Sequence, residues 1–98
     1  MLDFYLINDD QPKPNYPEQL SLEFVVGLDS KTFESLIKKG LIDSRFDYYS
    51  DFRWNLKVIE QINLNIVKAK NLDSDIDKLN LIINKALELK SGLIAYCD

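Results

Sequence analysis

The residues best suited to recognition lie close together in the middle of the chain. Arginine and aromatic side chains are interleaved there within ten positions, from Arg45 to Trp54. Tyr, Trp and Arg dominate binding hot spots, because they bury a large area and still offer polar groups. We therefore predict a protein-binding patch in this segment. Its candidate partner-binding residues are Arg45, Tyr48, Tyr49, Arg53 and Trp54.

A structural role for the same segment is the alternative interpretation, since aromatic side chains also anchor small cores. In that case Phe46, Phe52 and one tyrosine fill the space between the first two helices. The two arginines then form ion pairs that hold the loop in place, and their carboxylate partners are Asp43, Asp47 or Asp51. Both interpretations can hold together, because ten residues of loop and helix start cannot all point inward.

The first third of the chain is acidic. Residues 1–30 carry six carboxylates, among them Asp9 and Asp10, against the single cation Lys13. Phosphate binding needs clustered Lys and Arg, so this charge argues against a nucleic-acid partner. It is compatible with a basic protein partner, and Asp9 and Asp10 are the candidate contacts. The simpler interpretation is a solvated, Pro-rich loop in which paired aspartates form turns.

Several chemistries are excluded by residue type. The chain has no histidine, one cysteine and three scattered glycines. It therefore lacks the parts of a Ser-His-Asp or Cys-His centre, the common zinc sites and a phosphate-cradling loop. We predict that the protein is not an enzyme and uses no cofactor and no metal.

Length and composition predict one globular domain over residues 1–98, since 46% of the residues are hydrophobic and 29% are charged. No apolar run approaches the roughly 20 residues that span a bilayer, so no membrane association is expected. The N-terminal residues lack a basic segment followed by an apolar run, which argues against a signal peptide. A single cysteine gives no reason to expect an oxidising compartment, and a cytoplasmic location is predicted.

Hydrophobic periodicity predicts the elements that must position the candidate residues. Alternating apolar residues indicate strands near 2–8, 20–28 and 93–97. Leu20, Leu22, Phe24, Val26 and Leu28 are expected on one face of the second strand. Helical spacing predicts helices near 29–39, 51–70 and 74–91, the first capped by Asp29 and ended by Gly40.

Strands at both ends and helices between them predict an α+β domain, in which a small mixed sheet of about three strands is covered by three helices. The first and last strands are apolar on both faces. They are therefore expected to lie side by side at the centre of the sheet.

The chain also resembles small cytoplasmic immunity proteins and uncharacterised conserved proteins of bacteria. The segments that carry the resemblance are Leu2–Ile7, Asp47–Asp51 and Gly92–Asp98. The resemblance implies a bacterial, single-domain inhibitor that covers the active site of a toxin, which would be the basic partner. We expect a non-catalytic protein-binding module of this kind. A homo-oligomeric structural protein, with the aromatic patch as its own interface, is the alternative.

Overall fold

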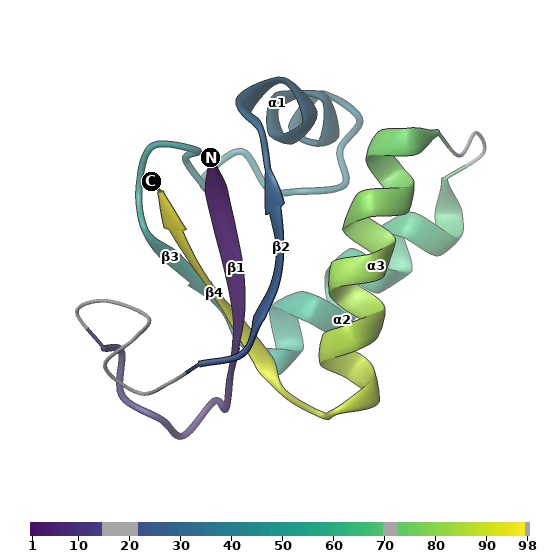
Figure 1. Cartoon of the computed structure of the whole chain (residues 1–98). Helices are drawn as coiled ribbons and strands as arrows, with labels where there is room; N and C mark the ends of the chain where they lie inside the picture. Colours follow the sequence, from purple (N-terminus) through teal and green to yellow (C-terminus); the bar gives the residue numbers. More distant parts are fainter. Residues whose placement is uncertain (15–21, 70–72, 98) are drawn as a thin grey trace.

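The computed structural model of the protein describes residues 1–14, 22–69 and 73–97, and these form a layer of helices against a sheet (Figure 1). The predicted α+β class is confirmed, with four strands in place of about three. In chain order the elements are β1 (Leu2–Ile7), β2 (Phe24–Leu28), α1 (Ser30–Lys38), β3 (Phe52–Trp54), α2 (Leu56–Lys68), α3 (Ser74–Glu88) and β4 (Gly92–Cys97).

The sheet is antiparallel throughout, with strand order β2-β1-β4-β3, so the prediction of a mixed sheet is wrong. The prediction that the first and last strands pair at the centre is confirmed, since Leu2 lies opposite Cys97 and Ile7 opposite Gly92. Figure 1 shows the two chain ends next to each other at one end of this central pair. β3 is the strand at one side of the sheet, and it carries part of the candidate segment.

The two faces of β1 contribute to separate apolar clusters, as its alternation predicts. Leu2 and Phe4 are fully buried in the main core beneath the helices, whereas Ile7 belongs to a smaller cluster on the other face of the sheet. Tyr96 of β4 joins that smaller cluster, and its hydroxyl donates a hydrogen bond of 2.8 Å to the carbonyl of Pro14. The loop that follows β1 therefore covers part of the second face.

The prediction of one apolar face along the second strand is wrong. Leu28 lies in the main core, but Leu22 packs on the other face and Phe24 stacks edge-on against Tyr5 with ring centroids 5.6 Å apart. The pairing of β1 with β2 shifts register between Phe4 and Tyr5. A bulge of this kind inserts one residue and so reverses the side chains beyond it. The predicted residues 20 and 21 lie outside the described residues.

The first predicted helix is confirmed, with both of its ends. Asp29 accepts a hydrogen bond from the Thr32 N–H at 2.8 Å, which satisfies an otherwise unpaired donor at the start of α1. At the other end Gly40 adopts a φ of 76°, and the Leu41 N–H donates to the Leu36 carbonyl. This is the Schellman arrangement that glycine favours, since it has no Cβ to clash.

The predicted start of the second helix is wrong. Residues 52–54 form β3, and α2 begins at Leu56 with Asn55 as its cap, accepting from the Val58 N–H at 2.9 Å. The alternation Phe52-Arg53-Trp54 directs two aromatic rings to the core and the arginine to the opposite face. Residue 70, the predicted end of this helix, lies outside the described residues.

The third helix ends at Glu88, earlier than the predicted residue 91, and Gly92 is the first residue of β4. Lys90 takes the left-handed conformation, with a φ of 52°. The described helices are each too short or too polar to cross a membrane.

Candidate functional site

The aspartates of the candidate segment shape its backbone. Asp43 accepts a hydrogen bond from the Arg45 N–H at 2.9 Å, and Asp47 accepts one from the Tyr49 N–H at 3.1 Å. Asp51 reaches across to β4 and accepts from the Cys97 N–H at 3.0 Å. Within the described residues neither arginine forms an ion pair with any of these carboxylates, so the ion-pair part of the alternative interpretation is wrong.

The aromatic part of the segment forms a plug that closes the main core. Measured between ring centroids, Phe46 lies 5.1 Å from Phe52 and 5.8 Å from Trp54. The Trp54 ring in turn lies 5.1 Å from the ring of Phe4 in β1. Trp54 has no exposed surface. It is therefore a core residue, and the prediction that it contacts a partner directly does not fit its position.

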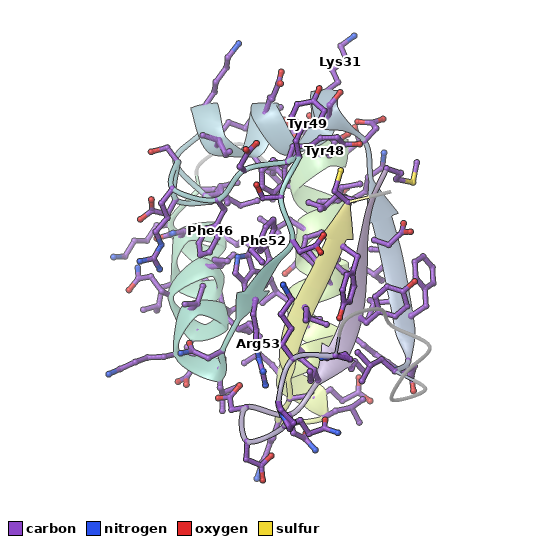
Figure 2. All side chains as sticks on the ribbon, turned by 90° about the vertical axis from the view of Figure 1, so that its left-hand side faces the viewer. Lys31, Phe46, Tyr48, Tyr49, Phe52 and Arg53 are labelled. Atoms are coloured by element: carbon purple, nitrogen blue, oxygen red, sulfur yellow. The ribbon has the colours of Figure 1, made fainter. Side chains whose placement is uncertain are left out.

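The two tyrosines lie apart from the arginines. Tyr48 is half-buried, with its ring centroid 6.0 Å from that of Phe33 in α1, and this burial raises the pKa of its hydroxyl above the ordinary value. Tyr49 packs edge-on against Tyr48 and keeps 71% of its surface exposed. Figure 2 shows both near the end of the molecule that carries Lys31, with Phe52 between them and Arg53.

Asp9 connects the first loop to the second helix. Its two carboxylate oxygens lie 3.1 and 3.2 Å from the Leu56 N–H, the first amide of α2. A Cβ on Gly92 would lie 2.6 Å from the Asp9 Oδ1 atom and 2.9 Å from the backbone carbonyl oxygen of Trp54, which cannot move aside, so glycine is needed there. Asp10 is exposed and makes no hydrogen bond or ion pair to the described part of the chain. Asp9 therefore has a structural role at the start of α2, whereas Asp10 lies on the surface.

Asp9 and the two arginines meet at an open hollow of about 510 Å³, which we call the arginine groove. Its lining residues are Asp9, Arg45, Phe46, Arg53, Asn55 and Val58. The lining residues come from the loop after β1, the loop before β3, the strand β3 and the start of α2. Figure 2 labels two of them, Phe46 and Arg53.

Arg45 is held by a contact between its guanidinium and an aromatic ring, and Arg53 is held by one hydrogen bond. Other N–H donors of each guanidinium remain available within the described residues. The guanidinium carbon of Arg45 lies 4.8 Å from the centroid of the Phe46 ring, a cation–π contact. The Nη2 atom of Arg53 donates to the Asn8 carbonyl. Within the described ranges, no carboxylate lies close enough to either guanidinium to form an ion pair.

A second hollow of about 220 Å³ adjoins the arginine groove and shares Arg45, Phe46 and Val58 with it. Its remaining lining residues are Gly40, Leu41, Asp43, Gln61, Ile62 and Asn65. The Asn65 amide donates to the Leu41 carbonyl at 3.2 Å, which ties α2 to the loop that forms the opposite wall. The two hollows together combine a charged end with an apolar end.

The structure therefore brings Arg45, Arg53 and Asp9 together and leaves Tyr49 and Asp10 elsewhere on the surface. Sequence reasoning missed Asn55 and Val58, which line the groove. Their signal is an Asn directly before an apolar helical run, the usual mark of a helix cap.

In the described part of the chain, no three carboxylate or cysteine side chains gather to hold a metal ion. The chain matches no protein-family model, no curated protein sequence and no solved structure.

Proposed function

We propose that the protein is a non-catalytic protein-binding module and that the arginine groove is its principal contact surface. The observation that carries this proposal is the pair of guanidinium groups, Arg45 and Arg53, on one groove without carboxylate partners in the described residues. An arginine held against an apolar surface loses little conformational entropy on binding, which makes it an effective hot spot.

The packing of the aromatic rings beneath Arg45 also supports a role of the groove in recognition. Phe46 lies under the Arg45 guanidinium and is itself packed against Phe52 and Trp54 of the core. The rigid aromatic plug thus presents a charged group at a fixed position. Preorganised groups of this kind bind more tightly, because less freedom is lost on association.

A binding assay with matched variants tests the proposal. The purified full chain, with a tag, is used to capture proteins from a lysate of its source organism, and each captured protein is then produced separately and titrated against the chain. We expect Arg45→Gln and Arg53→Gln to weaken the reconstituted complex, with unchanged circular dichroism. Lys31→Gln is the control: it also removes one positive charge, from an exposed position on α1.

If both arginine variants bind the reconstituted partner as tightly as the parent chain, the arginine groove is not the contact surface. Size-exclusion chromatography with light scattering distinguishes the homo-oligomeric alternative. A dimer that dissociates in the arginine variants, with no outside partner captured, would assign the groove to self-association.

The narrower form of the proposal is an immunity-type inhibitor whose partner is a toxin, as the sequence resemblance implies. In that case co-expression of the chain restores growth to cells that produce the captured protein, and co-expression of the Arg45→Gln variant restores it less. Full rescue by the arginine variants, or no rescue by the parent chain, would contradict it.

A further inference from the structure

Several carboxylates in the acidic first third of the chain already have partners within the fold. Asp9 accepts from the first amide of α2, and Asp29 caps α1. Glu23 lies 3.6 Å from the Lys85 ammonium group of α3. Three of these carboxylates therefore have partners within the fold, and the expectation of a basic partner loses much of its support.

The free charge on the candidate surface is positive instead. Arginine has five N–H donors, and Arg53 uses one of them on the Asn8 carbonyl. The Arg45 guanidinium contacts a ring face and donates to no described carboxylate. A guanidinium with free donors suits a carboxylate, because two parallel N–H groups can bind its two oxygens at once.

We propose that the arginine groove binds an Asp or Glu side chain of a partner protein, and that an apolar residue of the same segment enters the adjoining hollow. This proposal rests on the proposed function, since it names the chemistry of the partner at that same surface. The apolar residue would lie against Phe46, Val58 and Ile62, which line the second hollow. The partner segment is therefore acidic and apolar in neighbouring positions.

The charges of the groove favour a carboxylate over a phosphate group. Arg45 and Arg53 contribute two positive charges and Asp9 one negative charge, so the lining carries a net charge of +1. A phosphate monoester carries about −1.5 to −2 near neutral pH, which exceeds the +1 of the lining, and the Asp9 carboxylate repels it more strongly than it repels a singly charged carboxylate. A carboxylate carries a single charge and matches the groove.

Short random peptides displayed on phage, selected against the immobilised full chain, test the proposal. We expect selected peptides to share an Asp or Glu next to an apolar residue. Changing that acid to its amide in a synthetic peptide should weaken binding about tenfold or more, the typical contribution of a charged hydrogen bond. On the Arg45→Gln chain the same change in the peptide should have little further effect, whereas Lys31→Gln should preserve it.

The outcomes separate this proposal from the proposed function. Selected peptides that lack acids but still lose affinity on the arginine variants would overturn the carboxylate assignment and keep the groove as the contact surface. Peptide binding that is insensitive to both arginines would overturn both. In a parallel titration followed by NMR of the Arg45 and Arg53 side chains, shifts at lower concentrations of inorganic phosphate than of acetate would also overturn the preference for a carboxylate.

Discussion

Replacing Asp9 by alanine measures how much this loop residue contributes to the stability of α2, whose first amide lies 47 positions further along the chain. The substitution removes the acceptor of the Leu56 N–H and a negative charge at the start of a 13-residue helix. Losing a capping side chain typically costs about 0.5–2 kcal/mol, and losing the charge at the helix dipole about 0.3–1 kcal/mol. Asp9 is exposed, so water partly replaces it, and the expected loss is near the lower end, about 1 kcal/mol.

For a domain of this size, a loss of about 1 kcal/mol lowers the melting temperature by roughly 4–8 °C. Urea unfolding followed by the fluorescence of Trp54, the only tryptophan, and by circular dichroism gives the free energy directly. Asp10→Ala is the matched control, because it removes the neighbouring exposed carboxylate, and its effect should stay within about 0.5 kcal/mol. The Leu56 amide should also exchange faster with solvent in the Asp9 variant.

Equal stability of the Asp9→Ala and Asp10→Ala chains would refute this reasoning, because it would show that the contact with α2 contributes nothing in solution. Asp9→Asn provides a finer comparison, since the amide oxygen can still accept a hydrogen bond while the charge is lost. Its free energy of unfolding should lie between those of the parent chain and the alanine variant.

Three further predictions concern the fold. Trp54→Ala should lower the free energy of unfolding, measured in urea, by about 3–5 kcal/mol, because the ring is fully buried. Tyr49→Ala should change it by less than about 0.5 kcal/mol, because that ring is exposed. Similar losses for the two variants would contradict the assignment of Trp54 to the core and of Tyr49 to the surface. The Thr32 N–H holds the pKa of Asp29 below its ordinary value, and the Lys39 ammonium group does the same for Asp73. Both carboxylates therefore stabilise the fold above the ordinary Asp pKa, and this stabilisation is lost as the pH falls through their lowered pKa values. An Asp29→Asn, Asp73→Asn chain should therefore lose less stability between pH 6 and pH 3 in denaturant titrations, and an unchanged loss would be inconsistent with this account. Cys97 is partly buried and should react more slowly with a thiol reagent in the native chain than in urea; equal rates would show that the end of β4 opens freely.

Local patterns predicted much of the fold. The first helix carries its start and stop signals in its own sequence, Asp29 and Gly40, and both act as expected. The central strand pair follows from apolar residues on both faces of two segments. The short strand β3 was missed because three residues give little periodicity, and because Ser50 and Tyr49 also fit the start of a helix.

The site depends on contacts that a local pattern does not contain. Asp9 approaches Leu56 only because β1 and β4 pair and Gly92 leaves room for the loop, so no spacing in the sequence indicates it. The burial of Trp54 follows from the alternation of strand β3, whereas the sequence pattern predicts a helix over these residues. Arg45 is exposed and Arg53 is half-buried, and the groove that they share forms only in the complete fold.

The central pairing of β1 with β4 also sets the order in which the chain can fold. The middle of the sheet joins residue 2 to residue 97, so its ladder forms only after residue 97 has been synthesised. β3 pairs with β4 alone among the described strands, and it too must wait for the last strand. Contacts of such long sequence separation slow folding, because nearly the whole chain must close as one loop. Until then the apolar strand β1 has an unpaired edge, and a nascent or truncated chain in this state is the form most prone to aggregate or to bind a chaperone.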